Sequence, residues 1–226
     1  HSKVVEIASN DGYLLKNFVT KKIPCLGIEP TKGTADAARK LGIDVIEDFF
    51  GLQLSKKISV DFGKADLICG NNVYAHVPDI KDFTAGLKNL LNEEGTITLE
   101  FPHLLNLLKF NQFDTIYHEH FSYLSLGAVA NIFNKFDLKI YDVEEISTHG
   151  GSLRIYGSHN DSKYTQSKNV GRVIDVEDEY GLNTMKGYAN FQNLAFDIKL
   201  EFINFLINCK KQGKTVAGYG AAAKGN

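Results

Sequence analysis

The sequence predicts an α/β fold, in which helices cover both faces of a mostly parallel sheet. Short apolar runs alternate with segments of helical periodicity along the 226-residue chain, and this alternation is typical of parallel strands joined by crossover helices. Small and polar residues follow the first run, and an acid follows the second. Because ligands bind beyond the carboxyl ends of such strands, the pattern indicates a nucleotide-cofactor domain.

The expected elements follow one another along the chain. Apolar runs predict strands over 4–8, 25–29, 44–46, 65–70 and 95–101. Apolar residues at helical spacing predict helices over 13–20, 34–41 and 80–91. Two later runs, at 138–143 and 152–157, are spaced like a final hairpin. They predict an antiparallel strand at the end of the sheet.

The C-terminal part has a different character. Apolar residues recur at intervals of three and four: Tyr188, Phe191, Ala195, Ile198, Phe202 and Phe205. This spacing predicts a long helix whose apolar stripe packs on the sheet domain or on a partner. A strand-like run then enters a Gly-rich turn. We therefore expect a cofactor-binding domain at 1–160, a helical segment at 161–212, and the start of a second, Rossmann-like domain at 213–226.

Composition excludes several classes of protein. The content of 43% hydrophobic and 23% charged residues is that of an ordinary globular domain. A net charge of -2 provides no basic surface for nucleic acid. Cys25, Cys69 and Cys209 are too far apart for a metal knuckle, which favours reduced thiols. Because no apolar stretch reaches the roughly 18 residues of a membrane span, we expect a cytoplasmic protein. We also expect a small-molecule substrate, and the sequence does not indicate the oligomeric state.

The first turn indicates which cofactor is bound. A dinucleotide fingerprint requires Gly-x-Gly-x-x-Gly, whereas residues 6–12 read Glu-Ile-Ala-Ser-Asn-Asp-Gly. The Asp11 carboxylate would repel a pyrophosphate, but it suits the sulfonium and amino groups of S-adenosylmethionine. The turn resembles motif I of class I methyltransferases, with Ala8 in place of the first glycine, where a Cβ restricts the backbone.

Cofactor contacts are expected where the first four strands end. Glu29 should accept both ribose hydroxyls, the alternative being an exposed acid that caps the next helix. Asp48 and Phe49 should flank the adenine, although core packing is an equal explanation for Phe49 and Phe50. The other expected contacts lie near the methionine part of the cofactor: Glu6, Ala8, Asn10, Asp11, Gly12 and Asn71.

Reactive side chains are densest at 114–123, which holds two imidazoles, two phenols and two carboxyls. Histidine and glutamate bind zinc, but His-x-His with one neighbouring acid lacks a further ligand at helical spacing, so no metal is expected. Acid–base chemistry is favoured, because an imidazole titrates near neutral pH and a nearby acid or phenol can orient it. For each single histidine, a hydrogen-bonded structural role is the alternative.

Motifs along the whole chain occur in the same order as in the sugar C-methyltransferases, which this sequence resembles. They are Glu-Ile-Ala-Ser-Asn-Asp-Gly, Gly-Ile-Glu-Pro, Asn-Asn-Val-Tyr-Ala-His-Val-Pro-Asp, Tyr-His-Glu-His-Phe-Ser-Tyr, His-Gly-Gly-Ser-Leu-Arg and Gly-Tyr-Gly-Ala-Ala-Ala-Lys-Gly-Asn. The resemblance implies a class I methyltransferase fold, S-adenosylmethionine as cofactor, and a nucleotide-linked 4-keto deoxysugar as substrate. The family's plan also includes an N-terminal zinc-binding domain and a full C-terminal Rossmann-like domain, and we expect this chain to lack the first and most of the second.

The resemblance also implies a reaction. A base removes a proton from the carbon next to a ketone, and the enolate carbon then takes the methyl group. We expect His120 to be the base, Tyr117 and Glu119 to orient it or bind the sugar, and His76 to lie near the keto oxygen. Further substrate contacts are expected from Tyr74, His103, His118, Tyr123, His149, Arg154 and Lys224, of which Arg154 and Lys224 would meet a diphosphate.

Two other functions fit parts of the pattern. An NAD-dependent nucleotide-sugar oxidoreductase or epimerase would share the fold and the ribose acid, but should carry the three-glycine fingerprint that residues 6–12 lack. A non-catalytic binding member of the methyltransferase fold is disfavoured by the acid and histidine motifs. A smaller keto compound as methyl acceptor would require the same base and cofactor motifs.

Overall fold

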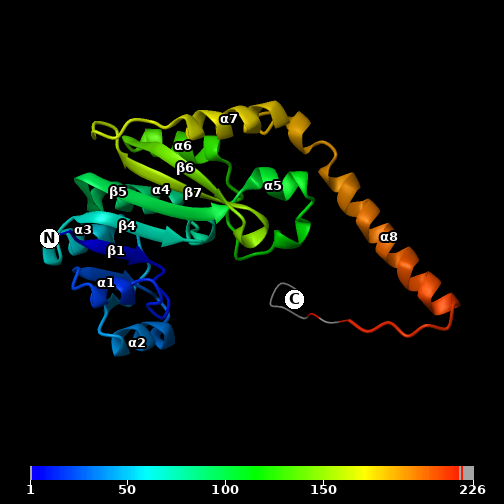
Figure 1. Ribbon diagram of the computed structural model, residues 1–226, viewed down its shortest axis with the longest axis horizontal. Helices are drawn as coiled ribbons and strands as arrows, with labels where there is room; N and C mark the ends of the chain where they lie inside the picture. Colours follow the sequence, from blue (N-terminus) through cyan, green and yellow to red (C-terminus); the bar gives the residue numbers. More distant parts are fainter. Residues whose placement is uncertain (1, 219, 221–226) are drawn as a thin grey trace.

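The computed structural model describes residues 2–218 and 220 and has one seven-stranded sheet (Figure 1). The strand order is β3-β2-β1-β4-β5-β7-β6, and β7 is antiparallel to both of its neighbours. The strands are β1 (Val4–Ile7), β2 (Cys25–Ile28), β3 (Asp44–Ile46), β4 (Ala65–Asn71), β5 (Leu91–Pro102), β6 (Leu138–Ile146) and β7 (Ser152–His159). The predicted fold class and the antiparallel strand are confirmed.

Helices connect the strands, and most of them cover the sheet. They are α1 (Lys16–Thr20), α2 (Lys32–Lys40), α3 (Leu52–Asp61), α4 (Ile80–Leu90), α5 (Leu104–Lys109), α6 (Leu126–Lys135), α7 (Lys168–Tyr180) and α8 (Phe191–Lys211). Two helices begin at side-chain caps that satisfy amides of the first turn. Asp79 accepts the amides of Lys81 and Asp82 before α4, and Ser125 accepts the amide of Ala128 before α6.

One face of the sheet carries the main core. Side chains alternate along β5, so Ile97, Leu99 and Phe101 point to the same face and are fully buried. Phe83 of α4 and Phe133 of α6 pack against them in one cluster. Burying a side chain of this size contributes about 2–3 kcal/mol to the free energy of unfolding. The apolar face therefore fixes the positions of the strand ends, where the site lies.

The opposite face is polar in its central part. Glu6, Cys69, Thr98 and Tyr156 form a row across four strands in the observed register. One row further toward the carboxyl ends of the parallel strands, Arg154 is paired with carboxylates of both neighbouring strands. Helices α1 and α2 cover the β1–β3 part of this face with a smaller apolar cluster.

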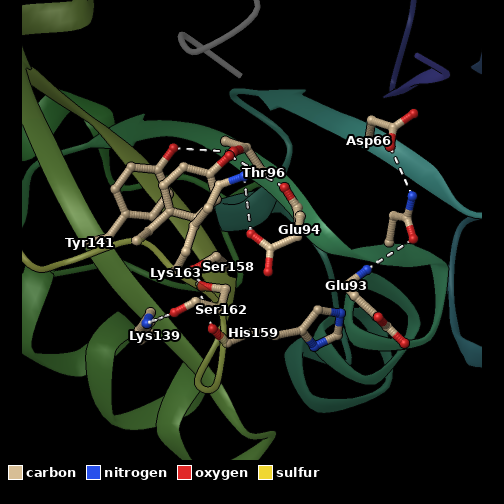
Figure 2. A network of polar contacts seen from close by, with 12 residues as sticks. Asp66, Glu93, Glu94, Thr96, Lys139, Tyr141, Ser158, His159, Ser162 and Lys163 are labelled. Atoms are coloured by element: carbon tan, nitrogen blue, oxygen red, sulfur yellow. Dashed lines mark hydrogen bonds and ion pairs between the residues drawn. The ribbon is translucent and has the colours of Figure 1, made fainter. Parts of the chain in front are cut away.

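The start of the inner strand β5 lies at the end of the sheet opposite the carboxyl ends of the parallel strands, and polar contacts hold it there (Figure 2). The Tyr141 hydroxyl lies 3.1 Å from Oγ1 of Thr96, and the Lys163 ammonium lies 3.3 Å from the Glu94 carboxylate. Ser158 and Ser162 are joined at 2.8 Å. These contacts fasten the β6–β7 hairpin and the loop after it to β5.

The helices after the hairpin behave differently from one another. Val170 and Val173 of α7 are buried in the main core, so the sheet domain extends past the predicted boundary at residue 160. Helix α8 instead projects away from the sheet (Figure 1), and Phe202 and Phe205 are 60% and 55% exposed. Of the two alternatives for the apolar stripe, packing on the sheet domain is therefore not observed for most of α8, and packing on a partner stays a prediction.

The start of a second, Rossmann-like domain expected at 213–226 falls largely on residues outside the described part of the chain. Residues 214–218 have no regular secondary structure, so the strand predicted there is not formed. Residues 221–226, which include Lys224, lie outside the described part of the chain. Within residues 2–218 and 220, no helix has the length and apolar character needed to cross a membrane.

Candidate active site

A cavity of about 620 Å³ opens at the carboxyl ends of β1 to β4. Ala8, Pro30, Asp48 and Val73 line it from the loops after these four strands. Its floor includes Phe83 of α4, and most of its surface is apolar. A cavity of this size and character is typical of sites for small molecules and cofactors. We call it the apolar cavity.

The turn after β1 has the backbone of a glycine-rich loop. Ala8, Asn10 and Gly12 have φ angles of 58°, 49° and 80°, in the left-handed region that favours glycine. A Cβ on Gly12 would collide with Ile43, so only glycine fits there. Ala8 takes the position of the first motif I glycine and adopts its conformation despite carrying a Cβ.

Glu29 joins this turn to the start of α2. Its side chain is buried, one carboxylate oxygen accepts the amide of Asn10 at 3.1 Å, and the other accepts the amide of Thr31 at 2.8 Å. The alternative of an exposed cap is therefore wrong, although Glu29 does bond to the residue before α2. A carboxylate has about four lone-pair sites, so two remain for a ribose diol. Its chain neighbours Ile28 and Pro30 line the apolar cavity.

The two phenylalanines after β3 have separate environments. Phe50 packs edge-to-face on Phe83, with ring centroids 5.1 Å apart, and so belongs to the core. Phe49 is 80% exposed and lines the apolar cavity beside Asp48. Phe50 also lines the cavity, but Phe49, the more exposed of the two, is the better placed to stack on an adenine.

Other expected cofactor residues do not line the apolar cavity. Glu6 is buried on the polar face of the sheet, and burial, together with repulsion from Asp11, raises its pKa from 4.5 to about 8. The Glu6 Oε2 atom has no hydrogen-bond partner within the described part of the chain. The residues expected at the cofactor that are absent from the cavity lining are Glu6, Asn10, Asp11, Gly12, Glu29 and Asn71.

A second pocket, of about 320 Å³, lies next to the apolar cavity. It is lined by Asp114, Tyr117, His120 and His149, and His76 lines both spaces. These side chains come from the segments after β4, after β5 and before β7. Groups far apart in sequence are therefore brought together beside the cofactor-sized space. We call this second space the polar pocket.

Backbone carbonyls set the proton positions of two histidines in the polar pocket. Nδ1 of His120 lies 3.0 Å from the carbonyl of Thr115, and Nδ1 of His76 lies 2.9 Å from the carbonyl of Glu119. Since a carbonyl only accepts, both Nδ1 atoms carry the hydrogen, and Nε2 is the acceptor of each neutral ring. Nε2 of His120 lies 3.3 Å from the Tyr117 hydroxyl. The two imidazole centroids are 4.7 Å apart.

Several expected substrate residues lie in or beside the polar pocket, and others do not. Tyr123 packs edge-on to His120 at 5.6 Å, and burial raises the pKa of its phenol. His118 is exposed and lines neither space. Glu119 reaches His76 through its carbonyl, and its exposed side chain is absent from both linings.

Three expected substrate contacts are corrected by the structure. Tyr74 is fully buried and its hydroxyl lies 2.7 Å from Thr84, which makes it a core residue whose pKa burial raises. His103 is 2% exposed and its Nε2 lies 2.7 Å from Glu177. Arg154 donates to Glu100 at 2.6 Å and also pairs with Glu144, so two carboxylates occupy it in place of a diphosphate.

The sequence analysis did not single out two other residues of the polar pocket. Asn72 has a φ angle of 54°, and its partly buried side-chain oxygen has no partner among the described residues. Gln112 donates to the carbonyl of Gly150 at 2.8 Å and so links two of the loops. The pair Asn71-Asn72 after an apolar strand was an available signal, because asparagine tolerates the left-handed turn. In the described chain, no three metal-binding side chains are grouped closely enough to hold an ion.

Comparison with known sequences gives matches along the whole chain. Residues 1–143 match the family model described as a methyltransferase domain, and residues 147–226 match the C-methyltransferase C-terminal domain. The C-methyltransferase NovU of Streptomyces niveus is 33% identical over 223 residues, which are 99% of this chain and 53% of the relative. The chain thus spans about half the length of this curated relative.

Solved structures share the fold at low identity. A possible histamine N-methyltransferase from Thermotoga maritima has a TM-score of 0.53 and 15% identity, covering 70% of this chain and 82% of the other. Magnesium protoporphyrin IX methyltransferase from Synechocystis PCC 6803, solved with SAH, has a TM-score of 0.52 and 13% identity, covering 69% and 73%. At these identities the likeness concerns the fold alone.

Proposed function

Since this chain belongs to the methyltransferase-domain family, whose cofactor is S-adenosylmethionine, we propose that it methylates the carbon next to a ketone in a nucleotide-linked deoxysugar. Carbon as the methylated atom is supported by the match to the C-methyltransferase C-terminal domain and by the similarity to NovU. The sugar substrate is supported by the motifs that this chain shares with the sugar C-methyltransferases.

One observation carries the proposal: the apolar cavity and the polar pocket are adjacent and share His76. A methyl transfer requires the donor and the acceptor carbon to be held in line at close range. A cofactor-sized space beside a pocket lined by His120 and Tyr117 supports such an arrangement. The same arrangement would serve hydride transfer poorly, because the turn after β1 lacks the glycines that admit a pyrophosphate.

We assign the apolar cavity to the cofactor. Phe49 and Asp48 would flank the adenine, and the two remaining lone pairs of Glu29 would accept the ribose hydroxyls. The turn at Ala8 would lie against the methionine part. When bound, S-adenosylmethionine supplies the methyl group, and its sulfur departs as a thioether.

We assign the polar pocket to the acceptor, with His120 as the base. Nε2 of His120 would take the proton from the carbon next to the ketone, while its Nδ1–H bond to the Thr115 carbonyl stabilises the imidazolium that forms. Tyr117, 3.3 Å from Nε2, would orient the ring. His76 would lie near the keto oxygen, with its ring held by the bond from Nδ1 to the carbonyl of Glu119.

Proton abstraction and methyl transfer can be measured separately. Candidate nucleotide-linked 4-keto deoxysugars are incubated with the protein in D₂O, and NMR follows loss of the proton next to the ketone. A second arm follows transfer of a ¹³C-labelled methyl group. We expect methylation at that carbon in the wild-type protein. In His120→Gln, we expect neither exchange of that proton nor transfer of the methyl group. The same substitution at exposed His118 should change neither signal, because His118 lines neither space.

The outcomes separate the alternatives. A product methylated on oxygen or nitrogen would contradict the proposal, as would full proton exchange in His120→Gln. If the protein methylates a smaller keto compound but no nucleotide-linked sugar, the proposed reaction stands and the proposed substrate class is refuted. Binding of the cofactor without turnover of any keto compound would favour the non-catalytic alternative.

A further inference from the structure

Glu177 is a buried acid that none of the assignments above uses. It belongs to α7 and is 2% exposed. One of its oxygens accepts the amide of Leu126 at 2.6 Å, and the other accepts the amide of Gly127 at 2.9 Å, so the carboxylate caps the start of α6. A negative charge is stabilised at a helix N-terminus by the free amides and the helix dipole.

The same carboxylate also holds His103. Nε2 of this buried imidazole lies 2.7 Å from Oε1 of Glu177. Because an ionised carboxylate only accepts, Nε2 of His103 carries the hydrogen. His103 is the first residue after β5, whereas Leu126 is the first residue of α6. Glu177 therefore bonds to both ends of one stretch of chain.

That stretch, residues 103–126, is here called the active-site segment. Its ends also meet each other directly: the amide of Leu104 donates to the carbonyl of Leu124 at 2.9 Å. Its middle part docks on the segment after β4, since the amides of Phe121 and Ser122 donate to the carbonyl of Ala75 at 2.9 Å and 3.2 Å. Between these anchors lie Tyr117 and His120.

We propose that Glu177 is a positioning residue: by fastening both ends of the active-site segment, it holds His120 in its place against His76 in the polar pocket. The effect on catalysis rests on the proposed function, whereas the anchoring of the segment does not. Glutamine in place of Glu177 would replace one of the two acceptor oxygens with an NH2 group, so it could not keep all three bonds.

Hydrogen–deuterium exchange tests the anchoring without any substrate. In Glu177→Gln, we expect amides of residues 113–122 to exchange faster on the order of tenfold, because buried donors lose their acceptor and the segment opens more often. Amides of β1 and β2, and the affinity for S-adenosylhomocysteine, should be unchanged. Glu179→Gln is the matched control, since Glu179 lies on the same helix and is exposed.

A second variant separates anchoring from helix capping. His103→Leu removes the bond between Glu177 and the first residue of the segment, but it leaves Glu177 to cap α6. It should accelerate exchange at 113–122 while the first turn of α6 stays protected. The double variant should exchange at 113–122 no faster than Glu177→Gln alone, because Glu177→Gln already weakens the connection that His103→Leu removes. Faster exchange confined to α6 in Glu177→Gln, or none at 113–122 in His103→Leu, would overturn the proposal.

The catalytic consequence has its own readout. With an acceptor that the wild-type protein methylates, Glu177→Gln should lower kcat on the order of tenfold while KM for S-adenosylmethionine stays within about twofold, because the cofactor cavity is untouched. A rise in that KM with kcat unchanged would contradict a positioning role. A wild-type protein that methylates no acceptor would refute the proposed function and leave the exchange result standing.

Discussion

Glu6 offers the sharpest test of the electrostatics of the sheet. It lies on β1, is 6% exposed, and has an oxygen that bonds to no described group. Burial is the main cause of its raised pKa, and repulsion from Asp11 adds to it. The perturbation is Glu6→Gln, which keeps the size of the side chain and removes the charge that burial disfavours.

The expected magnitude follows from the pKa. A shift from 4.5 to about 8 means that the unfolded chain ionises Glu6 well before the folded protein does. The stabilising contribution of the neutral carboxyl is therefore complete below pH 4.5 and is lost as the pH rises to about 8. At about 1.4 kcal/mol per pKa unit, the loss between pH 4.5 and pH 7 is about 3 kcal/mol. Glutamine has no such loss.

Urea denaturation at pH 4.5, 6 and 7.5, followed by circular dichroism, measures this difference. We expect the advantage of Glu6→Gln over the wild-type protein in free energy of unfolding to grow by about 3 kcal/mol across that range. The exposed strand residue Glu93 gives the control substitution, Glu93→Gln. Stability curves for Glu6→Gln and the wild-type protein that stay parallel with pH would refute the argument that Glu6 is neutral in the folded protein.

Three further substitutions test other parts of the account. Ala8→Gly should raise the free energy of unfolding by about 1 kcal/mol, because Ala8 has a φ angle of 58°; a loss of stability would contradict the strained turn. Arg154→Ala should lower it by about 1 kcal/mol, because Glu100 loses its main partner; weakened binding of a nucleotide sugar at unchanged stability would return Arg154 to the substrate site. His120→Gln should slow methyl transfer at least about a hundredfold with nearly constant cofactor affinity, and near-normal turnover would exclude it as the base.

The strands were predictable because each one is a short apolar run that ends at small or polar residues. The run 44–46 coincides with β3, and the ends of β1, β2 and β4 differ from the prediction by one residue. Strand β5 begins earlier than expected, at Leu91, because Leu91 pairs with Ala65 of β4 before a register shift that passes over residues 92–95. Local sequence favours a turn at that point, and only the pairing with β4 decides otherwise.

The site was less predictable, because burial and partners are properties of the folded chain. Tyr74 lies in a motif rich in polar residues, but the ring packs between Phe83 and Phe101 in the core. The bond from His103 to Glu177 joins residues 74 positions apart, which no local pattern encodes. The helical stripe of α8 was identified from its spacing alone, and spacing does not reveal what a helix packs against.

The most direct test of the central claim is calorimetric titration of this chain with S-adenosylhomocysteine, with NAD as the matched control. We expect binding in the micromolar range, no response to NAD, and a clear loss of affinity in Glu29→Ala, because the ribose would lose its acceptors. Binding of NAD, or of neither compound, would contradict the assignment of the apolar cavity to the methyl-donor cofactor.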